Sequence, residues 1–176
     1  MKRSLTIIAA GFISSSAIGH GLSSDAPTPS FCLIGAELGL PAGKYTVNDI
    51  PGCSSPPRPV TPTVNAAGLQ NTLAFYALGD FGNPNQLDRI TLMLNVNVRS
   101  EAKAAYPLLQ RAALQAAARL LGDNFVPKGI EAAVLSGGTH RWKVKTWEVE
   151  VKRTDWRPNS NGHQVTVRFT PLNPKP

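Results

Sequence analysis

The residues of this chain that could do chemistry gather near its C-terminal end. Residues 141–158, RWKVKTWEVEVKRTDWRP, contain all three tryptophans and six of the eighteen lysines and arginines. Trp142 and Trp147 belong to apolar strand patterns and are expected in the core. Trp156 stands next to Arg157 in a polar loop, and a ring beside a guanidinium suits stacking on a sugar or another planar group. We predict a contact site there; the alternative is a Trp156 ring folded back onto the sheet edge.

Two carboxylates in the same segment raise the question of hydrolysis. Glu148 and Glu150 are two residues apart, which is about 6.6 Å along a strand. That separation falls within the range of an inverting glycosidase pair. However, these residues alternate with lysines, and such alternation favours cross-strand ion pairs. We therefore assign no catalytic residue.

The polar face of the predicted sheet is a candidate binding surface. The residues expected to share it are Arg89, Asn95, Asn97, Lys143, Lys145, Glu148, Glu150, Lys152 and Arg168. Such a face could hold an acidic saccharide, a peptide or a protein, although a solvated polar face is also an ordinary feature of antiparallel sheets. We predict that Lys143, Lys145 and Arg168 bind the partner, together with Trp156 and Arg157.

Known metal and cofactor motifs are not found in the sequence. His20, His140 and His163 do not have metal-ligand spacing, and neither H-E-x-x-H nor C-x-x-C occurs. The sequence also contains no G-x-S-x-G elbow and no phosphate-binding glycine loop. We expect no metal, no cofactor and no nucleic-acid partner, although the formal net charge is +7.

The first nineteen residues have the pattern of a secretory signal peptide. Lys2 and Arg3 precede an apolar run at 5–13, and Ala17 and Gly19 suit a cleavage site after residue 19. The apolar run is too short to span a bilayer, so no membrane span is expected after processing. Removal of residues 1–19 lowers the formal charge from +7 to +5. We expect a periplasmic or secreted protein of a bacterium; a eukaryotic secreted protein is the alternative.

The two cysteines predict one structural disulfide. Cys32 and Cys53 are the only cysteines and have twenty residues between them. An even pair in an oxidising compartment is expected to be bonded. Closing a loop of this length should stabilise the fold by roughly 3 kcal/mol.

Composition divides the mature chain into four parts. These are a flexible tail at 20–29, a disulfide-stapled helix and loop at 30–53, a Pro-rich connector at 54–68 and an α+β domain at 69–172. In the second part, Ser30 is expected to cap a short helix that ends at Gly39.

Within the domain, hydrophobic periodicity predicts two hairpins separated by helices. Alternating apolar residues predict strands at 71–80 and 87–98, and again at 147–153 and 163–169. Helical spacing predicts a helix from a Ser100 cap to residue 122, bent or delayed by Pro107, and a second at 127–137. The phase of alternation changes near Thr146, where we expect a β-bulge. The predicted fold is a four-stranded, mainly antiparallel sheet, β-β-α-α-β-β, with helices on one face.

These features indicate an exported, non-enzymatic binding protein of the bacterial periplasm or cell envelope. Its partner would be an acidic polysaccharide or a protein. A periplasmic enzyme inhibitor or immunity-type protein is the alternative function, and a glycan hydrolase is the second alternative.

Overall fold

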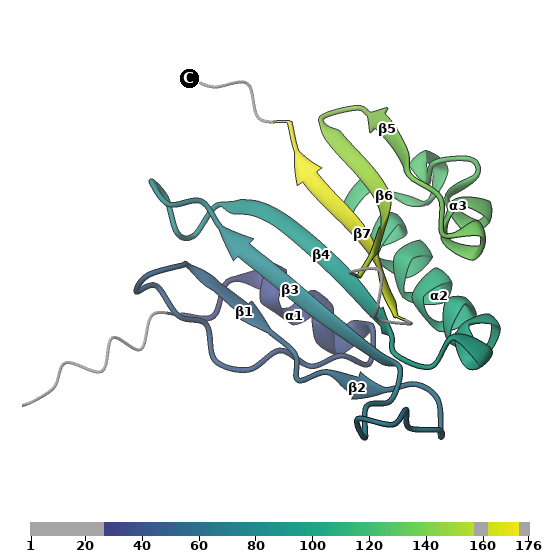
Figure 1. The fold of residues 1–176 in the computed structure, drawn as a ribbon. Coiled ribbons are helices and arrows are strands. Elements are labelled where there is room, and N and C mark those ends of the chain that lie inside the picture. The colour runs from purple at the N-terminus through teal and green to yellow at the C-terminus, as the bar shows by residue number, and fades with distance from the viewer. Residues whose placement is uncertain (1–26, 157–161, 173–176) are drawn as a thin grey trace, which may run out of the picture.

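The computed structural model describes residues 27–156 and 162–172 and has an α+β fold (Figure 1). In chain order its elements are α1 (Ser30–Glu37), β1 (Gly52–Ser54), β2 (Arg58–Pro59), β3 (Thr72–Gly79), β4 (Leu87–Val96), a 3-10 helix (Arg99–Glu101), α2 (Ala102–Leu121), a second 3-10 helix (Asp123–Phe125), α3 (Ile130–Ser136), β5 (His140–Val144), β6 (Trp147–Asp155) and β7 (His163–Pro171). The predicted signal peptide, most of the predicted tail and Arg157 lie outside the described residues.

All the strands belong to one antiparallel sheet. Its order is β1-β3-β4-β7-β6-β5, and β2 also pairs with β3. The two predicted hairpins are β3–β4 and β6–β7, and the pairing of β4 with β7 joins them into one sheet. The α+β class and the antiparallel sheet are therefore confirmed. The prediction of four strands is wrong, because the described chain forms seven.

Two of the additional strands are short and lie at one edge of the sheet. β1 pairs Gly52 with Leu78, and β2 pairs Arg58 with Leu73. β2 lies inside the Pro-rich segment, where Pro59 is tolerated because an edge strand leaves one side of its backbone unpaired. Neither strand has a periodic pattern of its own, since each is only two or three residues long.

The third additional strand comes from a turn where we expected a bulge. β5 and β6 form a hairpin in which Val144 pairs with Trp147, so Lys145 and Thr146 make a two-residue loop. Lys145 has a φ of 52°, and a positive φ at this position is characteristic of tight hairpin turns. The change of phase near Thr146 therefore marks the reversal of the chain direction.

One face of the sheet packs against the helices and forms the core. Along β4, the alternating Ile90, Leu92, Leu94 and Val96 are fully buried, as predicted from their period of two. The same cluster contains buried residues of α1, α2 and α3. In α2 the buried stripe consists largely of alanines, which allow the helix to approach the sheet closely.

The start of α2 differs from the prediction. The helix runs continuously through Pro107 from Ala102, and Ser100 lies in the preceding 3-10 helix without capping it. Glu101 instead accepts hydrogen bonds from the backbone N–H and hydroxyl of Thr63, at 3.4 and 2.5 Å. The helix entry is therefore tied to the loop before β3.

The predicted disulfide is present. It joins Cys32 in α1 to Cys53 in β1, with the two Cα atoms 6.0 Å apart. Ser30 is the first helical residue and makes no capping hydrogen bond. Gly39 follows the helix with a φ of 71°, and the backbone N–H of Leu40 then donates to Gly35 at 2.7 Å.

Candidate functional site

The face of the sheet opposite the core is not covered by any described helix (Figure 1). We call it the open face. The strand registers place Tyr76, Thr91, Arg168, Glu150 and Arg141 side by side across it, on β3, β4, β7, β6 and β5. This row combines an aromatic ring, two guanidinium groups and one carboxylate. It is the central row of the candidate site.

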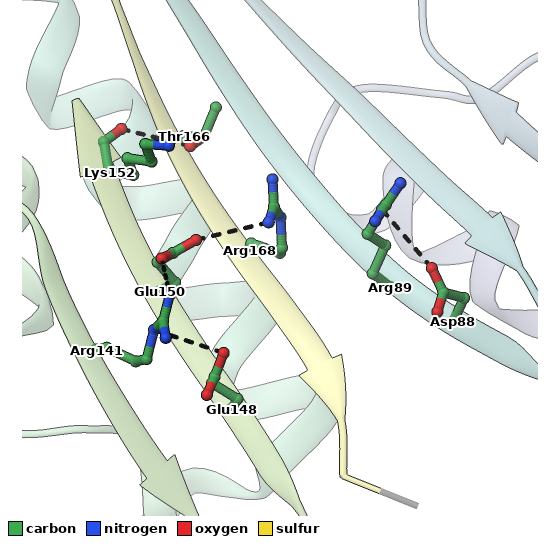
Figure 2. A network of polar contacts seen from close by, with 8 residues as sticks. All are labelled: Asp88, Arg89, Arg141, Glu148, Glu150, Lys152, Thr166 and Arg168. Atoms are coloured by element: carbon green, nitrogen blue, oxygen red, sulfur yellow. Dashed lines mark hydrogen bonds and ion pairs between the residues drawn. The ribbon is translucent and has the colours of Figure 1, made fainter. Parts of the chain in front are cut away.

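An ion-pair network occupies the β5 side of the open face (Figure 2). Arg141 Nη2 donates to Glu150 Oε1 at 2.5 Å, and Arg141 Nε lies 3.6 Å from Glu148 Oε1. On the other side, Glu150 Oε2 lies 3.6 Å from Nη1 of Arg168. The two carboxylates are therefore joined by one arginine, as expected for cross-strand ion pairing.

Glu150 is held in its charged form. Its side chain is 10% exposed, and the hydrogen bond from Arg141 is the main reason why its pKa is lowered, against the opposing effect of burial. A glycosidase general acid needs a raised pKa so that it carries a proton at neutral pH. The environment of Glu150 instead lowers its pKa, so the side chain does not carry that proton at neutral pH.

A trough of about 350 Å³ lies on the open face between these acids and β3. Its residues are Tyr76, Leu78, Arg89, Thr91, Met93, Lys152, Thr154, Gln164, Thr166 and Arg168. Three of them are cationic, three are large and apolar, and the described lining contains no carboxylate. Asp88 lies outside it, with Oδ2 3.7 Å from Arg89 Nε. We call this hollow the cationic trough.

Arg168 is the central cation of the trough. It lies on β7, one strand from Arg89 and one strand from Lys152, and is offset from each by one diagonal position. Its side chain is 41% exposed, but its Nε atom is buried and has no hydrogen-bond partner among the described residues. Because Nη1 is 3.6 Å from Glu150, this contact is an ion pair beyond ordinary hydrogen-bond length. The guanidinium thus retains donor capacity for another acceptor.

The other predicted binding residues do not gather at the trough. Lys143 lies on the open face opposite Glu148. Lys145 is in the β5–β6 turn and places Nζ 3.2 Å from the ring centroid of Phe125, a cation–π contact with the 3-10 helix after α2. The structure thus brings together Arg168 and Lys152, with Lys143 farther along the face.

Trp156 lies beyond the opposite end of β6 from Lys145. At the usual rise, the nine residues of β6 span about 30 Å, so one small ligand could not touch both residues. The Trp156 ring lies against Gly162, where a Cβ atom would be 2.3 Å from ring carbons, and its backbone N–H donates to Gly162 at 3.2 Å. This geometry resembles the expected alternative of a ring folded onto the sheet edge. The pairing of Trp156 with Arg157 stays a prediction.

Several residues of the open face were missed by sequence reasoning. The trough is lined by Tyr76, Leu78 and Met93. Arg141 forms ion pairs with both Glu148 and Glu150. The alternation in β4 puts Met93 on the same face as Arg89, four residues farther along the strand, but it does not identify Met93 as a binding residue. For Tyr76 no such signal existed, since the run containing β3 is apolar at almost every position and does not indicate which face is open.

Comparisons with family models, with curated proteins and with solved structures find no match for this chain. Within residues 27–156 and 162–172, no group of three or more His, Cys, Asp or Glu side chains could hold a metal ion. No helix in this part of the chain is long and apolar enough to cross a membrane. Fold and site together define an α+β protein with a helix-covered face and a cationic open face.

Proposed function

We propose that this chain is an exported, non-enzymatic binding protein of the bacterial periplasm or cell envelope, which holds an anionic partner on its open face. The observation that carries the proposal is the cationic trough, where Arg89, Lys152 and Arg168 surround a hollow with no carboxylate in its described lining. A binding role requires only that these groups be accessible and already held in place. Strands β4 and β7, each paired with a neighbouring strand on both sides, supply that support.

The charge balance of the open face supports an anionic partner. Five cations point to this face from β4 to β5, namely Arg89, Arg141, Lys143, Lys152 and Arg168. The acids beside them are Glu148, Glu150 and, at its margin, Asp88. Arg141 contacts both glutamates. Of the other four cations, three line the trough, namely Arg89, Lys152 and Arg168. The field of these cations attracts polyanions and weakens as salt screens it.

The apolar residues of the trough favour a partner that has apolar surface as well as negative charge. Tyr76, Leu78 and Met93 offer ring, methyl and thioether contacts next to the guanidinium of Arg168. Sugar rings carry apolar C–H faces, and aromatic side chains stack on them. An acidic polysaccharide of the envelope therefore fits the surface.

Export is part of the proposal. Residues 1–19 have the signal-peptide pattern, and the Cys32–Cys53 disulfide fits an oxidising compartment. Removal of the leader would leave a formal charge of +5 on the mature chain.

One observation favours a protein partner as the second candidate. Phe81, in the turn between β3 and β4, is 73% exposed, and exposed aromatic residues are typical of protein contact sites. A periplasmic inhibitor or immunity-type protein would use it. A glycan hydrolase is less well supported, because the carboxylates of the open face are ion-paired.

The proposal is tested by co-sedimentation of the processed, oxidised protein with isolated cell envelope and with peptidoglycan, at low and high salt. We expect sedimentation at low salt that is lost at high salt and in the variant Arg89→Gln/Lys152→Gln/Arg168→Gln. The charge-matched variant Lys103→Gln/Arg119→Gln/Lys128→Gln, altered on the helical side, should sediment like the wild type. Equal behaviour of the two variants, or no sedimentation of the wild type, would reject the proposed role.

A further inference from the structure

A second hollow lies on the other side of the sheet, where the layer of helices is interrupted. Its volume is about 270 Å³, and it is bounded by the segment after α1, by β2, by β3 and by α2. α1 has only eight residues and packs on β1 and β3. The hollow occupies the space between its C-terminal end and α2.

Three leucines contribute apolar surface to this hollow. Leu38 follows α1, Leu73 comes from the core-facing side of β3, and Leu108 comes from α2. Leu73 is buried, whereas Leu38 and Leu108 are half-buried. A hollow of this volume has room for a short aliphatic chain.

The rim of the hollow carries two arginines and no described acid. Arg58 in β2 and Arg111 in α2 are both exposed and both line it, with the amide of Gln115 one turn beyond Arg111. Arg58 Nη1 donates to the backbone oxygen of Gly39 at 3.3 Å, which holds its guanidinium at the end of α1. Arg111 has no hydrogen-bond or ion-pair partner among the described residues.

We infer that this hollow binds an aliphatic monocarboxylate, with its hydrocarbon tail on Leu38, Leu73 and Leu108 and its carboxylate at the guanidinium groups of Arg58 and Arg111. Guanidinium groups bind carboxylates through two parallel hydrogen bonds, and a few polar groups at the edge of an apolar hollow orient a ligand. This site lies on the opposite face of the sheet from the cationic trough and does not depend on the function proposed for the trough.

The disulfide holds one wall of this hollow in place. Leu38 lies within the loop that the bond between Cys32 and Cys53 closes, and that bond anchors α1 to the edge of the sheet. Reduction would release one wall of the hollow. The site is therefore matched to an oxidising compartment.

The test uses octanoate as the probe, with octanol and acetate as comparators, and isothermal titration of the processed, oxidised protein. We expect one octanoate bound per chain, and binding of octanol and acetate weaker by about tenfold or more. Arg58→Gln/Arg111→Gln should weaken octanoate binding to the same degree. Arg89→Gln/Lys152→Gln, which removes the same charge from the trough, should leave it unchanged.

A second variant tests the location of the tail. Gln115→Trp places a large ring at the mouth of the hollow from an exposed helical position, so the fold should be retained, as circular dichroism would verify. We expect it to abolish octanoate binding. The inference would be overturned if the wild type did not bind octanoate, if octanol bound equally well, or if the rim and mouth variants bound like the wild type.

Discussion

Arg141 and Glu150 face each other across the β5–β6 hairpin, with Nη2 of the arginine 2.5 Å from Oε1 of the glutamate. Glu150 also lies 3.6 Å from Arg168 on the next strand. The carboxylate is thus bound tightly on one side and loosely on the other. This asymmetry leaves part of the hydrogen-bonding capacity of the Arg168 guanidinium unused by Glu150.

Replacement of Arg141 should destabilise the protein. Arg141→Gln removes the main hydrogen bond to a carboxylate whose side chain is 10% exposed, and we expect a clear decrease in the free energy of unfolding because Glu150 would lose its nearest cation. Urea denaturation measures this loss. Lys143→Gln, on the same strand and exposed, is the control and should change stability by less than about 0.5 kcal/mol. Equal effects of the two substitutions would contradict the assigned role of Arg141.

The same pair predicts a pH dependence of stability. The pKa of Glu150 is lowered in the folded protein, chiefly by Arg141, so its contribution is present above the ordinary glutamate pKa of 4.5 and is lost as pH falls through the lower folded pKa. The stability advantage of the wild type over Glu150→Gln should therefore shrink between about pH 6 and about pH 3. Urea denaturation across this range measures it. Glu131→Gln, on α3, controls for the loss of one acidic side chain, and an advantage of wild type over Glu150→Gln that grew on acidification would refute the prediction.

Much of the fold could be predicted because a long strand with one buried face has apolar residues at every second position. In β4 the alternation from Ile90 to Val96 defines a buried and an open side, and Cys32 and Cys53 had only each other as partners. Strands β1 and β2 could not be found in this way. They form because the outer edge of β3 has backbone groups available for pairing. Pairing through backbone groups leaves no periodic pattern of side chains in such short segments.

The candidate site was less predictable, because it depends on register between strands distant in sequence. Arg168 reaches the trough only because β7 pairs with both β4 and β6. Lys145 had the charge expected of a binding residue, but the turn directs its side chain to Phe125. A bulge near Thr146 would have kept Lys145 on the polar face of a single strand. The chain instead turns at residues 145 and 146, so Lys145 lies in the turn.

Trp156 should be sensitive to the residue beneath its ring. In Gly162→Ala the added Cβ would lie 2.3 Å from ring carbons, so the ring must move, and we expect a loss of about 1–3 kcal/mol in stability together with a changed near-ultraviolet circular dichroism spectrum. Gly43→Ala is the matched control, since its nearest neighbour would be 3.7 Å away. Unchanged spectra and stability in Gly162→Ala would show that the ring does not rest on this glycine.

Loss of the disulfide should destabilise the edge of the sheet and the segment that carries α1. For Cys32→Ser/Cys53→Ser, with a sequence separation of 21 residues, we expect a loss of roughly 3 kcal/mol relative to the oxidised wild type. Thermal denaturation under oxidising conditions measures it. The reduced wild type should approach the double variant, and a double variant as stable as the oxidised protein would contradict this prediction.

We propose that Arg89, Lys152 and Arg168 hold an anionic partner at the trough. The most direct measurement is the salt dependence of binding to a defined probe, an oligomer of galacturonic acid, for the wild type and for Arg89→Gln/Lys152→Gln/Arg168→Gln. We expect wild-type affinity to fall steeply as salt rises, and the triple variant to bind at least about tenfold more weakly with a shallower dependence. Equal affinities and equal salt dependence in the two proteins would contradict the account.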